Sequence, residues 1–286
     1  MLDNTAPLDI VDQLNRTATH LRTPCGDGHM RWRSWGSGPP LVLLHGGFGS
    51  WMHWIRNIEP LSQRFRVIAG DLPGLGESDL PPDSGSPIPS PSAIGAIVAT
   101  GLRELLGDGR FDIAGFSFGG LIGGQAVKLL GKQVKTFTLV GASGLQLTRP
   151  PMQLMRRADD MNEADREAAY VHNAMTLMLH DAASLDALAL HIHKTNDSNA
   201  RLRSRKIGMG DSLLLALPDV SARIAGIWGE FDATTVGYMQ ERPDLLRSIQ
   251  PGAPFTVINN AGHWVQFEKS EAFNEALIEI IDGLSP

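Results

Sequence analysis

Three side chains of the types that nucleophilic catalysis needs occur in the order serine, aspartate, histidine, at Ser117, Asp232 and His263. A serine hydroxyl is a weak nucleophile at neutral pH, and a neighbouring imidazole can serve as its general base. The imidazole needs a carboxylate on its other nitrogen, which fixes the tautomer and stabilises the imidazolium. If the fold brings them together, the three residues could perform acyl transfer through a covalent intermediate.

The serine lies between two glycines in Gly115-Phe-Ser-Phe-Gly119. An apolar run from Phe111 to Ala114 predicts a buried strand before it, and Leu121 to Leu130 follows at helical spacing. Strand, glycine-flanked serine and helix form the context of a nucleophile elbow, a sharp turn that exposes the hydroxyl. A tight structural turn with an incidental serine is the alternative when this stretch is considered alone.

A second glycine-containing turn, His45-Gly46-Gly47, follows the predicted strand Leu41 to Leu44. Glycines at a strand end let peptide N–H groups point into a cavity without obstruction. We expect the N–H groups of Gly47 and Phe118 to form an oxyanion hole. An ordinary strand-to-helix turn is the alternative, and in both cases His45 is expected to bond the backbone rather than act as the base.

Strands and helices alternate along most of the chain, which predicts an α/β fold with a doubly wound, mostly parallel sheet covered on both faces. Ligands of such sheets bind beyond the carboxyl ends of the strands. Four candidate segments fall directly after predicted strands: His45 to Gly47, Ser117, Asp232 and His263. Between residues 145 and 217 the character changes to methionines, alanines and charges at helical spacing, which predicts a helical insertion.

The motifs together resemble those of the α/β-hydrolase fold superfamily. The matching stretches are His45-Gly-Gly, Asp71-Leu-Pro-Gly-Leu-Gly-Glu-Ser-Asp79, Gly115-Phe-Ser-Phe-Gly119, Trp228-Gly-Glu-Phe-Asp232 and Gly262-His263. The resemblance implies a core domain of residues 1–144 and 218–286 and a helical cap of residues 145–217. It also implies a triad of Ser117, Asp232 and His263, and favours Asp232 over the neighbouring Glu230 as the acid.

Near the end of the chain, Gly262-His-Trp-Val-Gln-Phe-Glu268 is similar to the corresponding segment of meta-cleavage-product hydrolases, which split a C–C bond next to a ketone. Two positions depart from that subfamily. Phe116 stands where it usually has asparagine, and Phe48-Gly-Ser follows the first glycines where it usually has Gly-Pro-Gly.

Aromatic residues near the predicted site favour an acyl or aromatic group over a sugar or phosphate. The expected substrate contacts are Phe48, Trp51, Phe116 and Trp264, although Phe116 and Trp264 would serve equally well in the core. Within Arg201-Leu-Arg-Ser-Arg-Lys206, one arginine turned inward could clamp a carboxylate, whereas most such runs are solvated helix faces.

The sequence therefore predicts a carboxylesterase-like serine hydrolase that acts on a small, largely apolar or aromatic ester. A C–C bond hydrolase of the meta-cleavage-product type and a catalytically slow ligand receptor on the same scaffold are the alternatives. No cofactor and no metal are expected, since the single cysteine excludes a cysteine-rich metal site and the histidines lack a complete ligand set.

The net charge of −6 over 286 residues gives no reason to expect nucleic acid or an anionic membrane surface as a partner. No apolar run approaches the ~18 residues of a membrane span, and the N-terminus lacks the basic start and apolar core of a signal peptide. A cytoplasmic protein with a small-molecule substrate is expected. The sequence leaves its oligomeric state open between monomer and homodimer.

Overall fold

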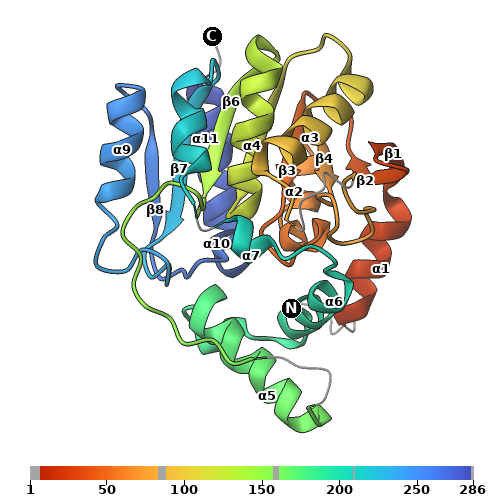
Figure 1. Cartoon of the computed structure of the whole chain (residues 1–286), viewed down its shortest axis with the longest axis vertical. Coiled ribbons are helices and arrows are strands. Elements are labelled where there is room, and N and C mark those ends of the chain that lie inside the picture. Colours follow the sequence, from red (N-terminus) through yellow and green to blue (C-terminus); the bar gives the residue numbers. More distant parts are fainter. Residues whose placement is uncertain (1–6, 83–87, 157–160, 209, 285–286) are drawn as a thin grey trace.

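The computed structural model describes residues 7–82, 88–156, 161–208 and 210–284 (Figure 1). At its centre lies an eight-stranded sheet with the strand order β1-β2-β4-β3-β5-β6-β7-β8. The strands are β1 (Thr19–Cys25), β2 (Gly28–Trp35), β3 (Pro40–Leu44), β4 (Arg66–Gly70), β5 (Phe111–Phe116), β6 (Val134–Val140), β7 (Arg223–Gly229) and β8 (Phe255–Ile258).

The sheet is antiparallel at one edge and parallel over the rest. β1 pairs with β2, and β2 with β4, in antiparallel register. From β4 onward, all neighbouring strands run parallel. The predicted doubly wound, mostly parallel sheet is therefore confirmed, and the carboxyl ends of the parallel strands meet at one edge.

Both faces of this sheet are buried, because side chains along a strand alternate between two hydrophobic clusters. In β3, Val42 and Leu44 belong to one cluster, and Leu41 and Leu43 belong to the other. Strands of a parallel sheet that is covered on both faces have nearly continuous apolar sequences, and the parallel strands here follow this rule.

Helices from distant parts of the chain cover the two faces (Figure 1). The first cluster includes residues of α3 (Pro91–Leu106) and α4 (Phe118–Leu130). The second includes residues of η1 (Trp51–Trp54), α2 (Ile58–Ser62), α10 (Val265–Glu268) and α11 (Ser270–Leu284). The remaining helix of the parallel part, α9 (Glu241–Ile249), places Leu246 in the first cluster.

Between β6 and β7 the structure describes only helical elements. They are α5 (Glu163–Asn173), η3 (Ala174–Met178), η4 (Ala182–Ser184), α6 (Ala187–Asn199), α7 (Ser204–Ile207), α8 (Ser212–Ala216) and η5 (Leu217–Asp219). Figure 1 shows α5 in green and α6 in teal, on the side of the sheet at which β6 ends. We call residues 145–217 the inserted segment, and its role as a separate cap stays a prediction.

The described part of the N-terminal region, residues 7–25, forms a helix and a strand. The polar sequence of residues 1–25 predicts an arm with a short helix around Leu8 to Leu14. α1 (Pro7–Thr17) agrees with that helix, whereas β1 was not predicted. Buried and exposed side chains alternate in only part of β1. This strand lies at the edge of the sheet, and most of its side chains are exposed or half-buried. Over the described residues, no helix is long and apolar enough to cross a membrane.

Candidate active site

A cavity of about 460 Å³ lies where the carboxyl ends of the parallel strands meet the inserted segment. Ser117, Phe118 and His263 line it from the sheet side. From the inserted segment come, among others, Arg149, Met152, Leu177, His193, Ser204 and Arg205. Residues that are far apart in the sequence therefore line one cavity.

Ser117 occupies the sharp turn between β5 and α4. Its backbone adopts φ 49° and ψ −110°, a region that residues other than glycine rarely populate. The turn is held because Ser117 N donates to Val140 O at 2.8 Å and Ser117 O accepts from Ser143 N at 3.1 Å. Gly119 permits the close passage of α4, since a Cβ there would collide with the carbonyl oxygen of Leu44. This is the strained strand–turn–helix geometry expected of an elbow.

The Asp232 carboxylate and the His263 ring form a buried pair. His263 Nδ1 donates to Asp232 Oδ2 at 2.8 Å, and the two side chains are 4% and 0% exposed, respectively. Thr234 donates from both its N and its Oγ1 to Asp232 Oδ1, each at 2.8 Å. Because Nδ1 carries the proton of the neutral ring, His263 Nε2 is left as an acceptor.

The electrostatics of this pair favour the ionised carboxylate. Burial by itself raises the pKa of Asp232, but the His263 ring and the hydrogen bonds from Thr234 outweigh burial and hold this pKa below its ordinary value. A carboxylate that stays charged can stabilise an imidazolium on the adjacent ring.

The loop that carries His263 is anchored by another buried carboxylate, Glu268. Its side chain accepts from Gly262 N at 2.6 Å, and also from His180 N and Asp181 N of the inserted segment. The segment just before His263 is thus tied directly to the inserted segment.

Successive N–H groups of the His45-Gly46-Gly47 turn differ in their partners. Gly46 N donates to His53 Nδ1 at 3.2 Å, and Phe48 N donates to Ser204 Oγ at 3.1 Å. For Gly47 N and Phe118 N, no acceptor occurs among the described residues. A Cβ built on Gly47 would lie 3.7 Å from Phe118 Cβ, so these two open N–H groups belong to adjoining backbone.

His45 bonds the backbone, as the sequence predicts. Its Nδ1 donates to Gly46 O at 2.7 Å, and its Nε2 accepts from Leu72 N at 2.8 Å. Burial lowers the pKa of His45 to about 4, and the bond to Gly46 opposes this shift only in part. A neutral His45 therefore fixes the turn at neutral pH.

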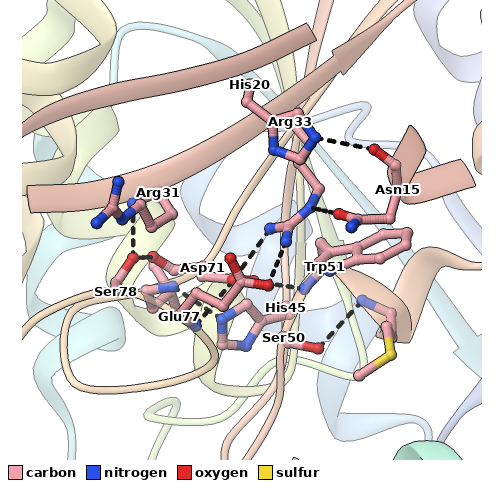
Figure 2. A network of polar contacts seen from close by, with 12 residues as sticks. Asn15, His20, Arg31, Arg33, His45, Ser50, Trp51, Asp71, Glu77 and Ser78 are labelled. Carbon is pink, nitrogen blue, oxygen red and sulfur yellow. Dashed lines mark hydrogen bonds and ion pairs between the residues drawn. The ribbon is translucent and has the colours of Figure 1, made fainter. Parts of the chain in front are cut away.

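Behind this turn lies an ionic network that the sequence did not predict (Figure 2). Asp71 accepts from Trp51 N at 2.7 Å, from Glu77 N at 3.0 Å and from Arg33 Nη1 at 3.4 Å. Arg33 also bonds Asn15 Oδ1 at 2.7 Å and pairs with Glu77. The network connects the antiparallel edge of the sheet to the elements that hold the His45 turn.

Two of the four aromatic residues expected to contact substrate line the cavity, namely Phe48 and Phe116. The other two, Trp51 and Trp264, are not among the described residues that line it. The Trp51 ring packs against Trp35 at 5.7 Å and beneath Arg33, because η1 directs it toward the antiparallel edge. Trp264 stacks on Phe267 at 4.1 Å, and so lies behind the cavity wall.

Several residues that line the cavity were not singled out by sequence reasoning. Ser204 and His53 are buried and bond the His45 turn, and Arg149 comes from the start of the inserted segment. Of the basic run, Arg205 lines the cavity, whereas Arg201 bonds Ser78 O and faces Asp79. Among these residues, Arg205 alone carried a sequence signal, as one of the cations of the basic run. The positions of the others depend on contacts between segments that are distant in the sequence.

Comparison with known proteins defines the class. The profile of the alpha/beta hydrolase fold family matches residues 39–205, which is more than half of the 286-residue chain. The chain therefore belongs to the alpha/beta hydrolase family, and it is a hydrolase of that fold.

Two hydrolases that share one name are among the proteins to which it is similar. A 2-hydroxy-6-oxononadienedioate/2-hydroxy-6-oxononatrienedioate hydrolase of Pseudomonas putida is 27% identical over 96% of this chain and 99% of that protein. The Escherichia coli K12 hydrolase of the same name is 28% identical over 84% of this chain and 86% of its own.

Among solved structures, a putative lipase of Acinetobacter baumannii matches with a TM-score of 0.78 at 19% identity, covering 99% of both chains. A putative aryl esterase of Burkholderia cenocepacia matches with a TM-score of 0.77 at 19% identity, over 93% of this chain and 99% of the other. At this identity, the structural likeness establishes the fold.

Proposed function

We propose that the protein is a serine hydrolase that cleaves a small, largely apolar or aromatic ester through an acyl-enzyme on Ser117. One observation carries the proposal. Ser117 and His263, which is paired with Asp232, line the same cavity as Gly47 and Phe118, whose N–H groups have no acceptor among the described residues. This is the set of groups that acyl transfer needs: nucleophile, base, orienting carboxylate and oxyanion donors.

In the proposed reaction, His263 Nε2 takes the proton of Ser117 Oγ as the oxygen attacks the ester carbonyl. The N–H groups of Gly47 and Phe118 stabilise the negative charge that develops on the carbonyl oxygen. The alcohol leaves with the proton held by His263, which gives the acyl-enzyme. Water, deprotonated by the same ring, then releases the acid and restores the serine.

The walls of the cavity support an apolar acyl or aromatic group. Phe48 and Phe116 line it from the sheet side, and Met152, Leu154, Leu177 and Met178 line it from the inserted segment. Such side chains gain from burying carbon and offer nothing to the hydroxyls of a sugar.

The test is hydrolysis of p-nitrophenyl esters of graded acyl length by the wild type and by Ser117→Ala. We expect the variant to lose kcat by about 10⁴- to 10⁶-fold. Ser143→Ala is the matched control, because Ser143 lines the same cavity and its hydroxyl has no partner within the described residues. A Ser117→Ala variant that still turns over would refute the mechanism, and a burst without steady turnover in the wild type would indicate a slow ligand receptor.

A second candidate is a C–C bond hydrolase of the meta-cleavage-product type, which would use the same groups on a ketone. Two observations favour it: the relatives named as such hydrolases match over nearly the whole chain, and Arg149 and Arg205 line the cavity, where they could bind a carboxylate. Comparing kcat/KM for p-nitrophenyl acetate with that for a coloured 2-hydroxy-6-oxo-dienoate separates the two candidates.

A further inference from the structure

His53 is a buried histidine that the proposed mechanism does not use, yet it lines the cavity. Its side chain comes from η1, and its ring lies 5.4 Å from Phe116 and 5.1 Å from Trp264, edge-on to both. Trp264 Nε1 also donates to His53 O at 2.9 Å. The ring is therefore held in one orientation by the aromatic residues around it.

The hydrogen bond from Gly46 fixes the tautomer of this ring. Gly46 N–H can only donate, and it points at His53 Nδ1 at 3.2 Å, so Nδ1 is the unprotonated nitrogen. A neutral imidazole with an acceptor at Nδ1 carries its proton on Nε2. His53 thus presents an N–H donor at the opposite side of the ring.

That donor opens onto the cavity. Nε2 forms no hydrogen bond with any described residue, and it is not among the polar atoms that are sealed from solvent without a partner. Because His53 lines the cavity, the exposed part of its ring is the part a ligand would meet. A buried, oriented donor with no protein acceptor is suited to a substrate oxygen.

The ring is also uncharged under ordinary conditions. Burial first, and then the neighbouring rings of His45, His193 and His263, lower the pKa of His53 well below its usual value. A neutral donor suits an uncharged carbonyl oxygen, whereas a carboxylate would be matched by the arginines Arg149 and Arg205 on the wall of the same cavity.

We propose that His53 determines substrate specificity by donating its Nε2–H to a ketone oxygen of the substrate, distinct from the oxygen of the scissile carbonyl. The inference rests on the proposed function, since it places this ketone on an acyl group bound at Ser117. It narrows the substrate class from apolar acyl esters to esters of oxo acids. An alkyl ester leaves the Nε2–H without a partner, which is the basis of the discrimination.

The test compares p-nitrophenyl hexanoate with the p-nitrophenyl esters of 3-oxo-, 4-oxo- and 5-oxohexanoate. These acyl chains have the same length and differ in where the second oxygen lies. For the wild type, we expect kcat/KM of at least one oxo ester to exceed that of hexanoate by roughly tenfold after correction for spontaneous hydrolysis. If no oxo ester is preferred, the proposal is overturned.

Two variants of His53 distinguish the role of Nδ1, which accepts from Gly46 N, from the role of Nε2, which carries the proton. In His53→Asn, the amide oxygen can replace Nδ1 as the acceptor for Gly46 N, but nothing replaces Nε2–H. In His53→Gln, the longer amide reaches the place of Nε2 and can still donate. We expect the oxo-to-alkyl ratio of kcat/KM to fall to about one in His53→Asn and to persist in His53→Gln. An unchanged ratio in His53→Asn would mean that His53 only supports the His45 turn.

Failure of this inference is distinguishable from failure of the proposed function. Ser117→Ala abolishes hydrolysis of every ester if the acyl-enzyme mechanism holds, whatever His53 does. As an independent readout, ¹⁵N NMR of the imidazole groups should report a neutral His53 with its proton on Nε2 at pH 7. A proton on Nδ1, or an imidazolium, would contradict the proposal.

Discussion

Two buried aspartates flank the candidate active site and differ in their charged partners. Asp71 bonds two backbone N–H groups and the guanidinium of Arg33. Asp232 bonds Thr234 twice and the ring of His263. Burial raises the pKa of Asp71 in spite of Arg33, whereas the pKa of Asp232 is lowered in spite of burial, by His263 and Thr234.

The difference lies in whether the partner can change its charge. Arg33 is always cationic, so its pairing with Asp71 is permanent and holds the network behind the His45 turn in place. The ring of His263 borders the cavity and gains its charge only when it takes a proton. We infer that the first aspartate serves the fold and the second the reaction, and substituting each of them can break or sharpen that distinction.

The largest effect is expected for Asp232→Asn. The amide retains the volume and the bonds to Thr234, but it no longer stabilises the His263 imidazolium or fixes the tautomer. We expect kcat for p-nitrophenyl esters to fall by about 10⁴-fold with little change in the unfolding midpoint. Glu230→Gln is the control, because Glu230 is exposed and bonds Asn260 N. If Glu230→Gln inactivates the enzyme and Asp232→Asn does not, the acid has been assigned to the wrong residue.

Asp71→Asn should show the opposite pattern. Removing this charge leaves the buried Arg33 guanidinium with the exposed carboxylate of Glu77 as its one ion-pair partner among the described residues. The free energy of unfolding in urea should drop by about 3–5 kcal/mol, while kcat at a temperature where the variant is folded falls far less than in Asp232→Asn.

Glu77→Gln is the matched control for this prediction. It removes the other carboxylate of Arg33, which is 60% exposed, so a cost of at most about 1 kcal/mol is expected. A folded Asp71→Asn protein that has lost kcat as completely as Asp232→Asn would erase the distinction between the two aspartates.

The smallest effect concerns pH and the neutral His45. Its pKa of about 4 in the fold lies below that of an unfolded histidine, so the unfolded chain binds the additional proton as the pH falls below ~6.5. The stability that neutral His45 provides is complete above that pH and is lost toward pH 4. His53, whose pKa is also lowered, adds to the loss in the same direction.

Between pH 7 and pH 5, His45→Gln should therefore lose about 2 kcal/mol less stability than the wild type, measured by urea unfolding at both values. Glutamine can still accept from Leu72 N at the place of Nε2. His20→Gln, at an exposed position, should retain the wild-type pH dependence. If the free energy of unfolding changes equally with pH in the wild type and in His45→Gln, the fold does not lower the pKa of His45.

The sequence predicts those parts of the fold and site that depend on local pattern. The strands predicted at Leu41 to Leu44 and at Phe111 to Ala114 agree with β3 and β5, because apolar runs and flanking turns specify them. Ser117 and the Asp232–His263 pair lie beside the cavity because each follows a parallel strand, and the topology brings those strand ends together.

What the sequence could not predict depends on side-chain direction and on contacts across the fold. Trp51 and Trp264 are both aromatic residues close to the candidate motifs in the sequence, but their rings pack against Trp35 and Phe267 and do not line the cavity. Conversely, His53 belongs to no motif identified in the sequence. Its proposed role as a donor depends on the Gly46 N–H group, which points at its Nδ1. Such an arrangement becomes visible only when the two loops are placed in space.

The positive φ of Ser117 has a consequence for how this protein could change over time. Glycine would adopt that backbone conformation at little cost, so exchanging the serine for glycine relieves strain on the order of 1–3 kcal/mol. If Ser117 is the nucleophile that we propose, heat resistance and turnover place opposite demands on this position. A library selected only for surviving high temperature should accumulate inactive glycine variants here, and one selected for ester cleavage should retain the strained serine.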